Sequence, residues 1–301
     1  MDSMAALPLT LERPISPWLE MGAYEFLWTK AQQSFKTIAD LFRDRENAVP
    51  SDFVLAEIAE KCARDATDIL HHASVKKFGI RLYGTGEYPI RLRDAKNPVQ
   101  LLYFQGWWDL VRTPCVAVVG TREPSDTGIA RAKKLVRNLV EDGYTIVSGL
   151  ASGIDAVAHE TAIMCKGFTV AVIGTKLSQA YPTENAELQA QIARDYLLIS
   201  QVPIIRSSTQ DWRSNRSFFP QRNITMSALT CATLIVEASD TSGTLMQARA
   251  AIQQGRKLFI LDSCFKDLSL TWPRRYEKLG AIRVRDYKDI QKHLGNPPSD
   301  N

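Results

Sequence analysis

Between residues 116 and 262, short apolar runs alternate with longer segments in which apolar residues recur every three or four positions. Runs such as VAVV and TLIV are apolar throughout, which is typical of strands buried on both faces of a sheet. The wider spacing is typical of amphipathic helices, as at Ile129, Ala132, Leu135 and Leu139. Strands that alternate with helices in this way form βαβ units, so the sequence predicts an α/β fold with a doubly wound, parallel sheet.

The same patterns set the expected element boundaries. A long polar segment at 203–217 separates two of the units. The strand-like segments are 116–120, 145–149, 169–174, 197–200, 233–238 and 257–261, and the helix-like segments are 127–142, 155–166, 184–194, 221–230 and 243–254.

The flanking segments follow other patterns. Three- and four-residue apolar spacing from Pro17 to about His72 predicts helices, with a polar linker at 44–52 and Ser51 or Asp52 as a helix N-cap. Residues 266–292 contain one helix-like stretch and a short strand near 281–284. The expected parts are a flexible arm at 1–16, a small helical (SAM-like) domain at 17–76, a core at 77–265 that short strands and turns introduce, and a short extension at 266–301 with a disordered end from 294.

Four of the strand-like segments end in glycine-rich turns. Because the carboxyl ends of parallel strands lie along one edge of the sheet, these turns should converge on one crevice. Backbone N–H groups at such turns and at the following helix N-termini attract phosphate. The turns are VAVVGTRE (116–123), TIVSGLASGID (145–155), TVAVIGTK (169–176) and TLIVEASDTSGT (233–244), and together they predict a phosphate-bearing ligand.

Composition narrows the class of protein. The 301 residues are 45% hydrophobic and 23% charged, with a net charge of +4 that permits a polyanionic partner without requiring one. The 5 cysteines include no CxxC pair, so neither a metal site nor a disulfide framework is indicated, and no cofactor is expected. No apolar run reaches the roughly 20 residues of a membrane span, and the N-terminus does not read as a signal peptide. The expected location is the cytoplasm.

The segment SGLASGIDAVAH at 148–159 carries the densest chemistry. Gly149 and Gly153 allow close approach of a ligand to the backbone, and the hydroxyls of Ser148 and Ser152 are potential donors. A hydrolase would pair Ser152 with His159 and Asp155. However, an aspartate on the same helical turn seldom orients a histidine toward the preceding loop, and no G-x-S-x-G elbow is present. We expect Asp155 to cap the helix and His159 to pack locally.

The first turn, GTREPSDTG at 120–128, lacks the G-x-G-x-x-G of dinucleotide enzymes, and no Walker A motif occurs in the chain. Gly120 and Thr121 offer backbone donors, and Arg122 can hold a phosphate through two hydrogen bonds. The alternative is that Arg122 forms an ordinary surface salt bridge. An NTPase is not favoured.

Two further segments suit a nucleic acid. WRSNRSFFPQRN at 212–223 interleaves Arg213, Arg216 and Arg222 with aromatic residues, so that charges can follow phosphates while rings stack on bases. The alternative is that Phe218 and Phe219 anchor the loop to the core. Ser242, Gly243 and Thr244 precede a predicted helix and form either an anion site or an ordinary cap.

Taken together, GTRE, GYTIVSGLASGIDAVAHETAI, GFTVAVIGT, AYPTEN, LLIS, FFPQRN and LIVEASDTSGTLMQARAAIQQGRKLFIL closely resemble the DNA-processing protein A family (DprA, also called Smf) over residues 88–262. The resemblance implies an extended Rossmann-like core that binds single-stranded DNA, forms a homodimer and loads a RecA-type recombinase during natural transformation, without known enzymatic activity. The site residues that it implies are Gly120, Thr121, Arg122, the segment from Ser148 to Gly153, Gly174, Arg222, Asn223 and the segment from Ser242 to Thr244.

The chain departs from the family pattern at three places. Ile224 replaces an arginine after Asn223, Gln201 replaces an acid, and Lys176 and Ser178 alter the turn after Gly174. Lys176 restores a positive charge and joins the expected phosphate contacts. The tail after Asp262 is too short for the winged helix that other members carry, and these departures leave room for a specialised role in anti-phage defence or regulation.

Two other functions remain open at this point. The crevice also suits a sensor of a nucleotide-derived small molecule. An enzyme acting on nucleotides, such as a phosphoribohydrolase, is disfavoured because Gln247 stands where that group has an acid. The sequence carries no readable motif for a dimer interface or for a recombinase-docking surface.

Overall fold

The computed structural model describes residues 14–45 and 47–295 and contains one sheet in the order β1-β2-β6-β5-β4-β3-β7-β8-β9. The strands from β6 to β9 in that order are parallel to one another, whereas β2 is antiparallel to both β1 and β6. The strands are β1 (Gly79–Leu82), β2 (Leu101–Gly106), β3 (Cys115–Val119), β4 (Thr145–Ser148), β5 (Thr169–Ile173), β6 (Leu197–Ser200), β7 (Ala232–Ile235), β8 (Lys257–Leu261) and β9 (Ile282–Val284).

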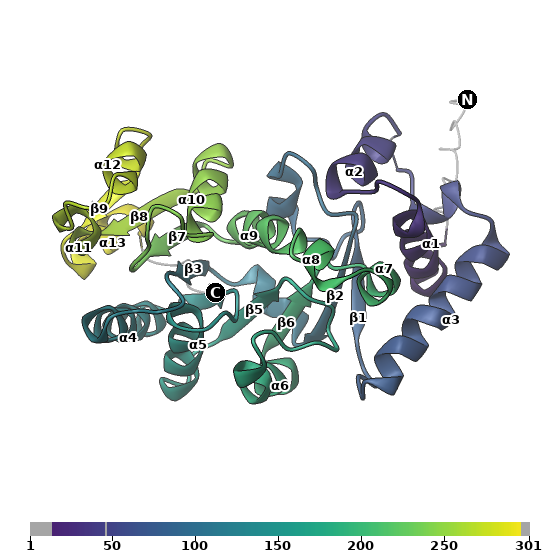
Figure 1. The fold of residues 1–301 in the computed structure, drawn as a ribbon, viewed down its shortest axis with the longest axis horizontal. Helices are drawn as coiled ribbons and strands as arrows, with labels where there is room; N and C mark the ends of the chain where they lie inside the picture. Colours follow the sequence, from purple (N-terminus) through teal and green to yellow (C-terminus); the bar gives the residue numbers. More distant parts are fainter. Residues whose placement is uncertain (1–13, 46, 296–301) are drawn as a thin grey trace, which may run out of the picture.

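Helices cover both faces of this sheet. In Figure 1, α4, α5 and α6 lie along one face and α9 and α10 along the other, while α1 to α3 lie at the end of the molecule next to β1. The α-helices are α1 (Pro17–Thr29), α2 (Phe35–Arg43), α3 (Ala56–His72), α4 (Asp126–Glu141), α5 (Ile154–Met164), α6 (Ala186–Asp195), α7 (Ile204–Thr209), α8 (Trp212–Asn215), α9 (Phe218–Leu229), α10 (Thr244–Gln253), α11 (Asp262–Lys266), α12 (Trp272–Glu277) and α13 (Tyr287–Leu294). Short 3₁₀ turns are η1 (Pro50–Phe53), η2 (Ile90–Asp94), η3 (Trp108–Arg112) and η4 (Thr183–Asn185).

The predicted doubly wound, mostly parallel sheet is confirmed. Every residue of β3, β4, β5, β6 and β7 is buried, as expected for continuous apolar strands covered on both faces. Helix α4 shows why the helical prediction succeeded. Its N-cap, Ser125, accepts a hydrogen bond from the backbone N–H of Gly128, and Ala132, Val136 and Leu139 bury one face.

The predicted polar segment 203–217 is largely helical, because α7 and α8 occupy it. Helix α9 also begins earlier than the predicted residue 221. The reason is tertiary: the side chain of Phe218 is buried against Trp28 of α1 and Phe35 of α2, with ring centroids 6.2 and 6.1 Å away. This packing carries the helix back to residue 218.

The predicted N-cap at Ser51 or Asp52 is wrong, because α3 begins only at Ala56 with Leu55 in the capping position. Ser51 instead binds the buried carboxylate of Glu20 in α1, with its backbone N–H at 2.9 Å and its hydroxyl at 2.7 Å. The linker is therefore fastened to the first helix.

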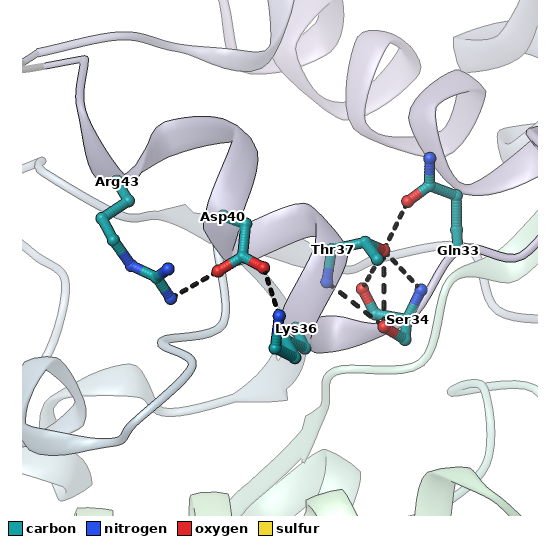
Figure 2. A network of polar contacts seen from close by, with 6 residues as sticks. All are labelled: Gln33, Ser34, Lys36, Thr37, Asp40 and Arg43. Atoms are coloured by element: carbon teal, nitrogen blue, oxygen red, sulfur yellow. Dashed lines mark hydrogen bonds and ion pairs between the residues drawn. The ribbon is translucent and has the colours of Figure 1, made fainter.

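Helix α2 illustrates how the N-terminal helices are stabilised locally (Figure 2). Ser34 and Thr37 form a reciprocal capping box, in which each side chain accepts a hydrogen bond from the other residue's backbone N–H. Asp40 pairs with Lys36 at 2.7 Å and with Arg43 one turn later. These contacts are local to the helix and exposed, so the position of α2 depends on its buried face, which includes Ile38.

A buried carboxylate joins α1 to the sheet. Glu25 accepts hydrogen bonds from the Tyr103 hydroxyl on β2 and from the backbone N–H groups of Ile204 and Ile205, both at 2.8 Å, at the start of α7. Burial raises the pKa of Glu25, and these donors oppose that shift. One continuous apolar cluster also runs from Trp28 of α1 to the strands. The helices at 17–76 thus share a core with the sheet.

The C-terminal part is more ordered than predicted. The expected short strand is confirmed as β9, which pairs with β8 and extends the sheet past residue 265. Two helices, α12 and α13, flank it where one helix-like stretch was expected within 266–292, and α11 ends at the start of that range. Residues 1–13 of the predicted arm and 296–301 of the predicted disordered end lie outside the described residues. Within the described residues, no helix is long and apolar enough to cross a membrane, and no cluster of three or more His, Cys, Asp and Glu side chains suits a metal.

Candidate functional site

The order of the sheet places a crevice beside β3. Strands β4, β5 and β6 follow on one side of β3, and β7, β8 and β9 on the other, so the loops leaving the carboxyl ends of β3 and β7 diverge there. A cavity of about 460 Å³ opens at this point. The turns after β3, β4 and β7 line it as predicted. The loop after β5 reaches it through Tyr181, whereas the predicted Gly174 of that loop does not line it. A second cavity of about 230 Å³ adjoins it and shares Arg122, Tyr181, Phe219 and Arg222.

Close backbone packing explains the glycines of these turns. A Cβ on Gly153 would lie 2.5 Å from the carbonyl oxygen of Thr121, and the φ of Gly153 is 75°, a conformation that favours glycine. A Cβ on Gly120 would lie 2.6 Å from the Ile154 side chain. The backbone N–H of Thr121 donates to the carbonyl of Glu237 at 2.7 Å. Thr121 therefore ties β3 to β7, and its predicted role as a free backbone donor is not supported.

Arg122 is an exposed cation that lines both cavities of the crevice. Its side chain forms no ion pair with any residue in the described part of the chain. The alternative of a surface salt bridge therefore finds no partner among residues 14–45 and 47–295. A guanidinium that keeps its hydrogen-bonding face free is suited to a phosphate.

Arg222 has a different environment, because only 5% of its surface is exposed. Its guanidinium donates to the carbonyl of Gly149, to the carbonyl of Val172 at 2.9 Å and to Oδ1 of Asn223 at 2.8 Å. Burial lowers the pKa of Arg222, whereas the nearby carboxylate of Asp155 raises it. Arg222 thus fastens α9 to the ends of β4 and β5, with its remaining surface lining the cavities.

The three residues of a conceivable catalytic triad are engaged elsewhere. The Ser152 hydroxyl donates to Glu184 at 2.9 Å, and Asp155 accepts from the backbone N–H groups of Gly149 and Ala151. His159 is fully buried, bonds Thr169 at 2.7 Å, and has a pKa that burial lowers to about 3. The local role expected for His159 is confirmed. The helix cap predicted for Asp155 is wrong, because Gly153 occupies the N-cap position of α5 and no side chain caps that helix. Asp155 instead holds the preceding loop.

The N-terminus of α10 forms another wall of the larger cavity. The Ser242 hydroxyl accepts from the backbone N–H of Thr244 at 3.2 Å, and the Thr244 hydroxyl donates to the carbonyl of Gly120 at 3.1 Å. The Asn223 amide donates to the carbonyl of Gly243 at 3.1 Å. The side chains therefore act as caps and ties, as in the alternative interpretation. Gly243 itself is exposed and lines the cavity, where no atom would meet its Cβ within 4 Å.

Five predicted site residues line neither cavity: Ser148, Gly153, Gly174, Lys176 and Arg213. Ser148 is buried and donates to the carbonyl of Val118 at 2.7 Å. Gly174 packs under the ring of Phe219, where a Cβ would lie 2.6 Å from the ring. Lys176 donates to Ser208 at 2.6 Å and lines neither cavity, and Arg213 is exposed outside them.

Several aromatic and other side chains that line the crevice were not among the site residues predicted from the sequence. Tyr181 is 49% exposed and its ring centroid lies 5.4 Å from that of Phe219. Phe219 lines both cavities, whereas the neighbouring Phe218 is buried, so the interpretation that the ring anchors the loop to the core holds for Phe218. The aromatic signal lay in the AYP and FFP motifs. The wall residues Met246 and Gln247 carry no comparable signal in the sequence.

Residues 79–295 match the family model of DNA recombination-mediator protein A. The chain belongs to this family. It is 38% identical over 227 residues to protein Smf of Synechocystis sp. and 32% identical over 209 residues to the DNA processing protein DprA of Bacillus subtilis, in each case over 69% of this chain. The matched segments span 56% and 68% of those two relatives.

Solved structures agree with this assignment. The X-ray structure of DprA from Streptococcus pneumoniae superposes with a TM-score of 0.66 at 27% identity, over 92% of this chain and 93% of that one. DNA processing protein A from Helicobacter pylori, whose structure concerns its single-stranded DNA binding mode, gives a TM-score of 0.62 at 27% identity, over 72% of this chain and 95% of that one. The family resemblance read from the motifs is confirmed, and so is the Rossmann-like core that it implied.

Proposed function

We propose that this chain binds single-stranded DNA in the crevice beside β3 and assists DNA processing and recombination without catalysing a reaction. The observation that carries the proposal is Arg122, an exposed guanidinium without an ion-pair partner among the described residues, at the wall shared by both cavities. The Helicobacter relative, described by its binding of single-stranded DNA, supports the same ligand. The relatives favour this function over a sensor of small nucleotides.

The proposed contacts divide by chemistry. Phosphates lie against Arg122, Arg216 and the N-terminus of α10 at Gly243, all of which line the larger cavity. Bases lie against the Tyr181–Phe219 pair, since an aromatic face accepts any base. Eight other predicted residues shape the crevice by holding its loops together: Gly120, Thr121, Gly149, Gly153, Arg222, Asn223, Ser242 and Thr244.

The non-enzymatic part of the proposal rests on the engaged states of Ser152, Asp155 and His159. We further propose a homodimer and a RecA-type recombinase as partners in the cytoplasm, because the family implies them. Natural transformation and a specialised role in phage defence are both compatible with this binding activity.

A salt titration of DNA binding tests the proposal. Affinity for single-stranded DNA should fall steeply with salt, and Arg122→Ala should weaken binding to all sequences and reduce the slope of log K against log salt by about 0.7, the value for one lost phosphate contact on a single strand. The control is Arg137→Ala, which removes the same charge from the exposed side of α4, away from both cavities.

Equal effects of the two substitutions, or binding that does not depend on salt, would contradict the proposal. A thermal shift with a mononucleotide and none with oligonucleotides would favour a small-molecule sensor instead. Parallel titrations with duplex DNA and RNA establish whether the single strand of DNA is preferred.

A further inference from the structure

Trp212, at the start of α8, is a large aromatic side chain left exposed to solvent. Its exposed fraction is 64%, and the guanidinium carbons of Arg213 and Arg216 each lie 5.7 Å from the centre of its ring. Neither arginine forms an ion pair with a residue in the described ranges. The nearest acid in the sequence, Asp211, is occupied as the N-cap of α8, where it accepts from the backbone N–H groups of Arg213 and Ser214 at 2.8 and 3.0 Å.

The short helix that carries Trp212 is held in place by side-chain hydrogen bonds. Asn215 donates to the carbonyl of Ser207 in α7 at 2.9 Å and accepts from Gln210 at 2.7 Å. Gln210 in turn accepts from Arg206, which donates to the carbonyl of Trp28 in α1 at 3.2 Å. The backbone that presents the indole is therefore tied to two neighbouring helices, and a ligand that binds there has less chain to order.

The surface around Trp212 continues into the crevice. Arg216 both lies beside the indole and lines the larger cavity. Three residues further on, Phe219 lines both cavities, while Phe218 between them is buried and anchors the start of α9. A chain of cationic and aromatic groups thus leads from the crevice to Trp212.

We propose that Trp212 stacks a base of the bound single strand just outside the crevice, with Arg213 and Arg216 contacting the phosphates on either side. The inference rests on the proposed function and extends it: the ligand is a polynucleotide long enough to leave the cavity, because a mononucleotide held inside gains nothing from this ring. Stacking on an aromatic face needs no particular base, so the site adds affinity without sequence preference.

The test compares two oligonucleotides of about 12 nucleotides, a length within the range that single-strand binding modules cover. One is oligothymidylate, and the other carries abasic positions throughout, so that it keeps the phosphates and lacks the bases. Trp212→Ala should weaken binding of oligothymidylate roughly five- to 150-fold, the range that base stacking on an aromatic spans, and Trp212→Phe should restore most of it. On the abasic strand, Trp212→Ala should have little effect.

The matched control is Trp107→Ala. Trp107 is also exposed, at 52%, but it follows β2, whose end pairs with the start of β6 and so lies at the opposite edge of the sheet from the crevice. This substitution should leave both affinities unchanged. Because Trp212 is mainly exposed, the variant is expected to fold, and its thermal unfolding should match that of the wild-type protein.

The possible outcomes distinguish the stacking site at Trp212 from the proposed function. If the wild-type protein binds oligothymidylate and Trp212→Ala binds it equally well, the stacking site is refuted while the proposed function stands. An equal loss on the abasic strand also refutes stacking, because the ring would then act on the backbone. If the wild-type protein binds neither strand, the proposed function and this inference fall together.

Discussion

Substitution of Arg222 is predicted to destabilise the fold, whereas substitution of Arg122 is predicted to leave its stability nearly unchanged. Arg222→Met removes a guanidinium that is 5% exposed and close to Asp155, itself 5% exposed. The carbonyls of Gly149 and Val172 lose their donor as well. Losing one partner of a buried charge interaction typically costs about 3–5 kcal/mol, and methionine fills much of the space without replacing the charge. Arg122→Ala is exposed and should change the free energy of unfolding by less than about 0.5 kcal/mol.

Equilibrium denaturant unfolding of each variant measures this difference, and DNA binding is measured on the same preparations. A double-mutant cycle with Asp155→Asn isolates the electrostatic part. Asp155→Asn with Arg222→Met should lose less stability than the sum of the two single changes, because the double variant no longer buries an uncompensated carboxylate.

The reasoning from burial is refuted if Arg222→Met unfolds within about 0.5 kcal/mol of the wild-type protein and yet fails to bind DNA. Arg222 would then act as a phosphate ligand, the role proposed for Arg122. A double variant whose loss equals the sum of the single losses would show instead that the two carbonyls, and not Asp155, depend on Arg222.

Three further substitutions test other parts of the structure. Burial lowers the pKa of His159 from 6.5 to about 3, so between those pH values the unfolded chain binds a proton there that the folded protein does not. As the pH falls through this range, the free energy of unfolding of the wild-type protein should decrease by about 1.4 kcal/mol per pH unit relative to that of His159→Asn. Plots of unfolding free energy against pH that run parallel for the two proteins would contradict this. Glu25→Gln replaces one carboxylate oxygen with an amide N–H₂, which then faces a backbone N–H donor, and should lower the free energy of unfolding by about 1–3 kcal/mol. An unchanged denaturant midpoint would show that the fold does not need both oxygens of Glu25 as acceptors. Gly153→Ala places a Cβ 2.5 Å from a backbone oxygen at a φ of 75° and should lower the free energy of unfolding by about 1–3 kcal/mol. Its control, Gly243→Ala, adds a Cβ in open space and should leave stability almost unchanged. Equal decreases in the thermal unfolding temperature of the two variants would contradict this account of the turns.

The two buried carboxylates respond to pH in the direction opposite to His159. Burial is the largest cause of the raised pKa values of Glu25 and Asp155. In the folded protein they hold their protons to higher pH than in the unfolded chain, so their contribution favours the folded state at low pH and declines as the pH rises through the raised pKa values. The His159 comparison is therefore made between variants at each pH, so that the carboxylates contribute equally to both curves.

The sequence by itself determined the fold class, the alternation of strands and helices in the parallel part of the sheet, and the sheet edge at which the crevice lies. These features depend on short-range patterns: apolar runs, helical spacing as in α4, and glycines where turns approach one another, as at Gly153. The motifs also carried the family, which the relatives confirm. Each of these signals lies within a few residues of the element that it describes, so a linear reading recovers them.

Only the tertiary structure decided which of the marked side chains face the crevice. In the sequence Arg122 and Arg222 look alike, yet one is exposed and the other is buried among carbonyls from β4 and β5. Phe218 and Phe219 are neighbours, yet one packs on Trp28 of the N-terminal helices and the other meets Tyr181. The physical reason is that exposure and hydrogen-bond partners depend on segments far apart in the chain, which meet only when the sheet and its helices pack together.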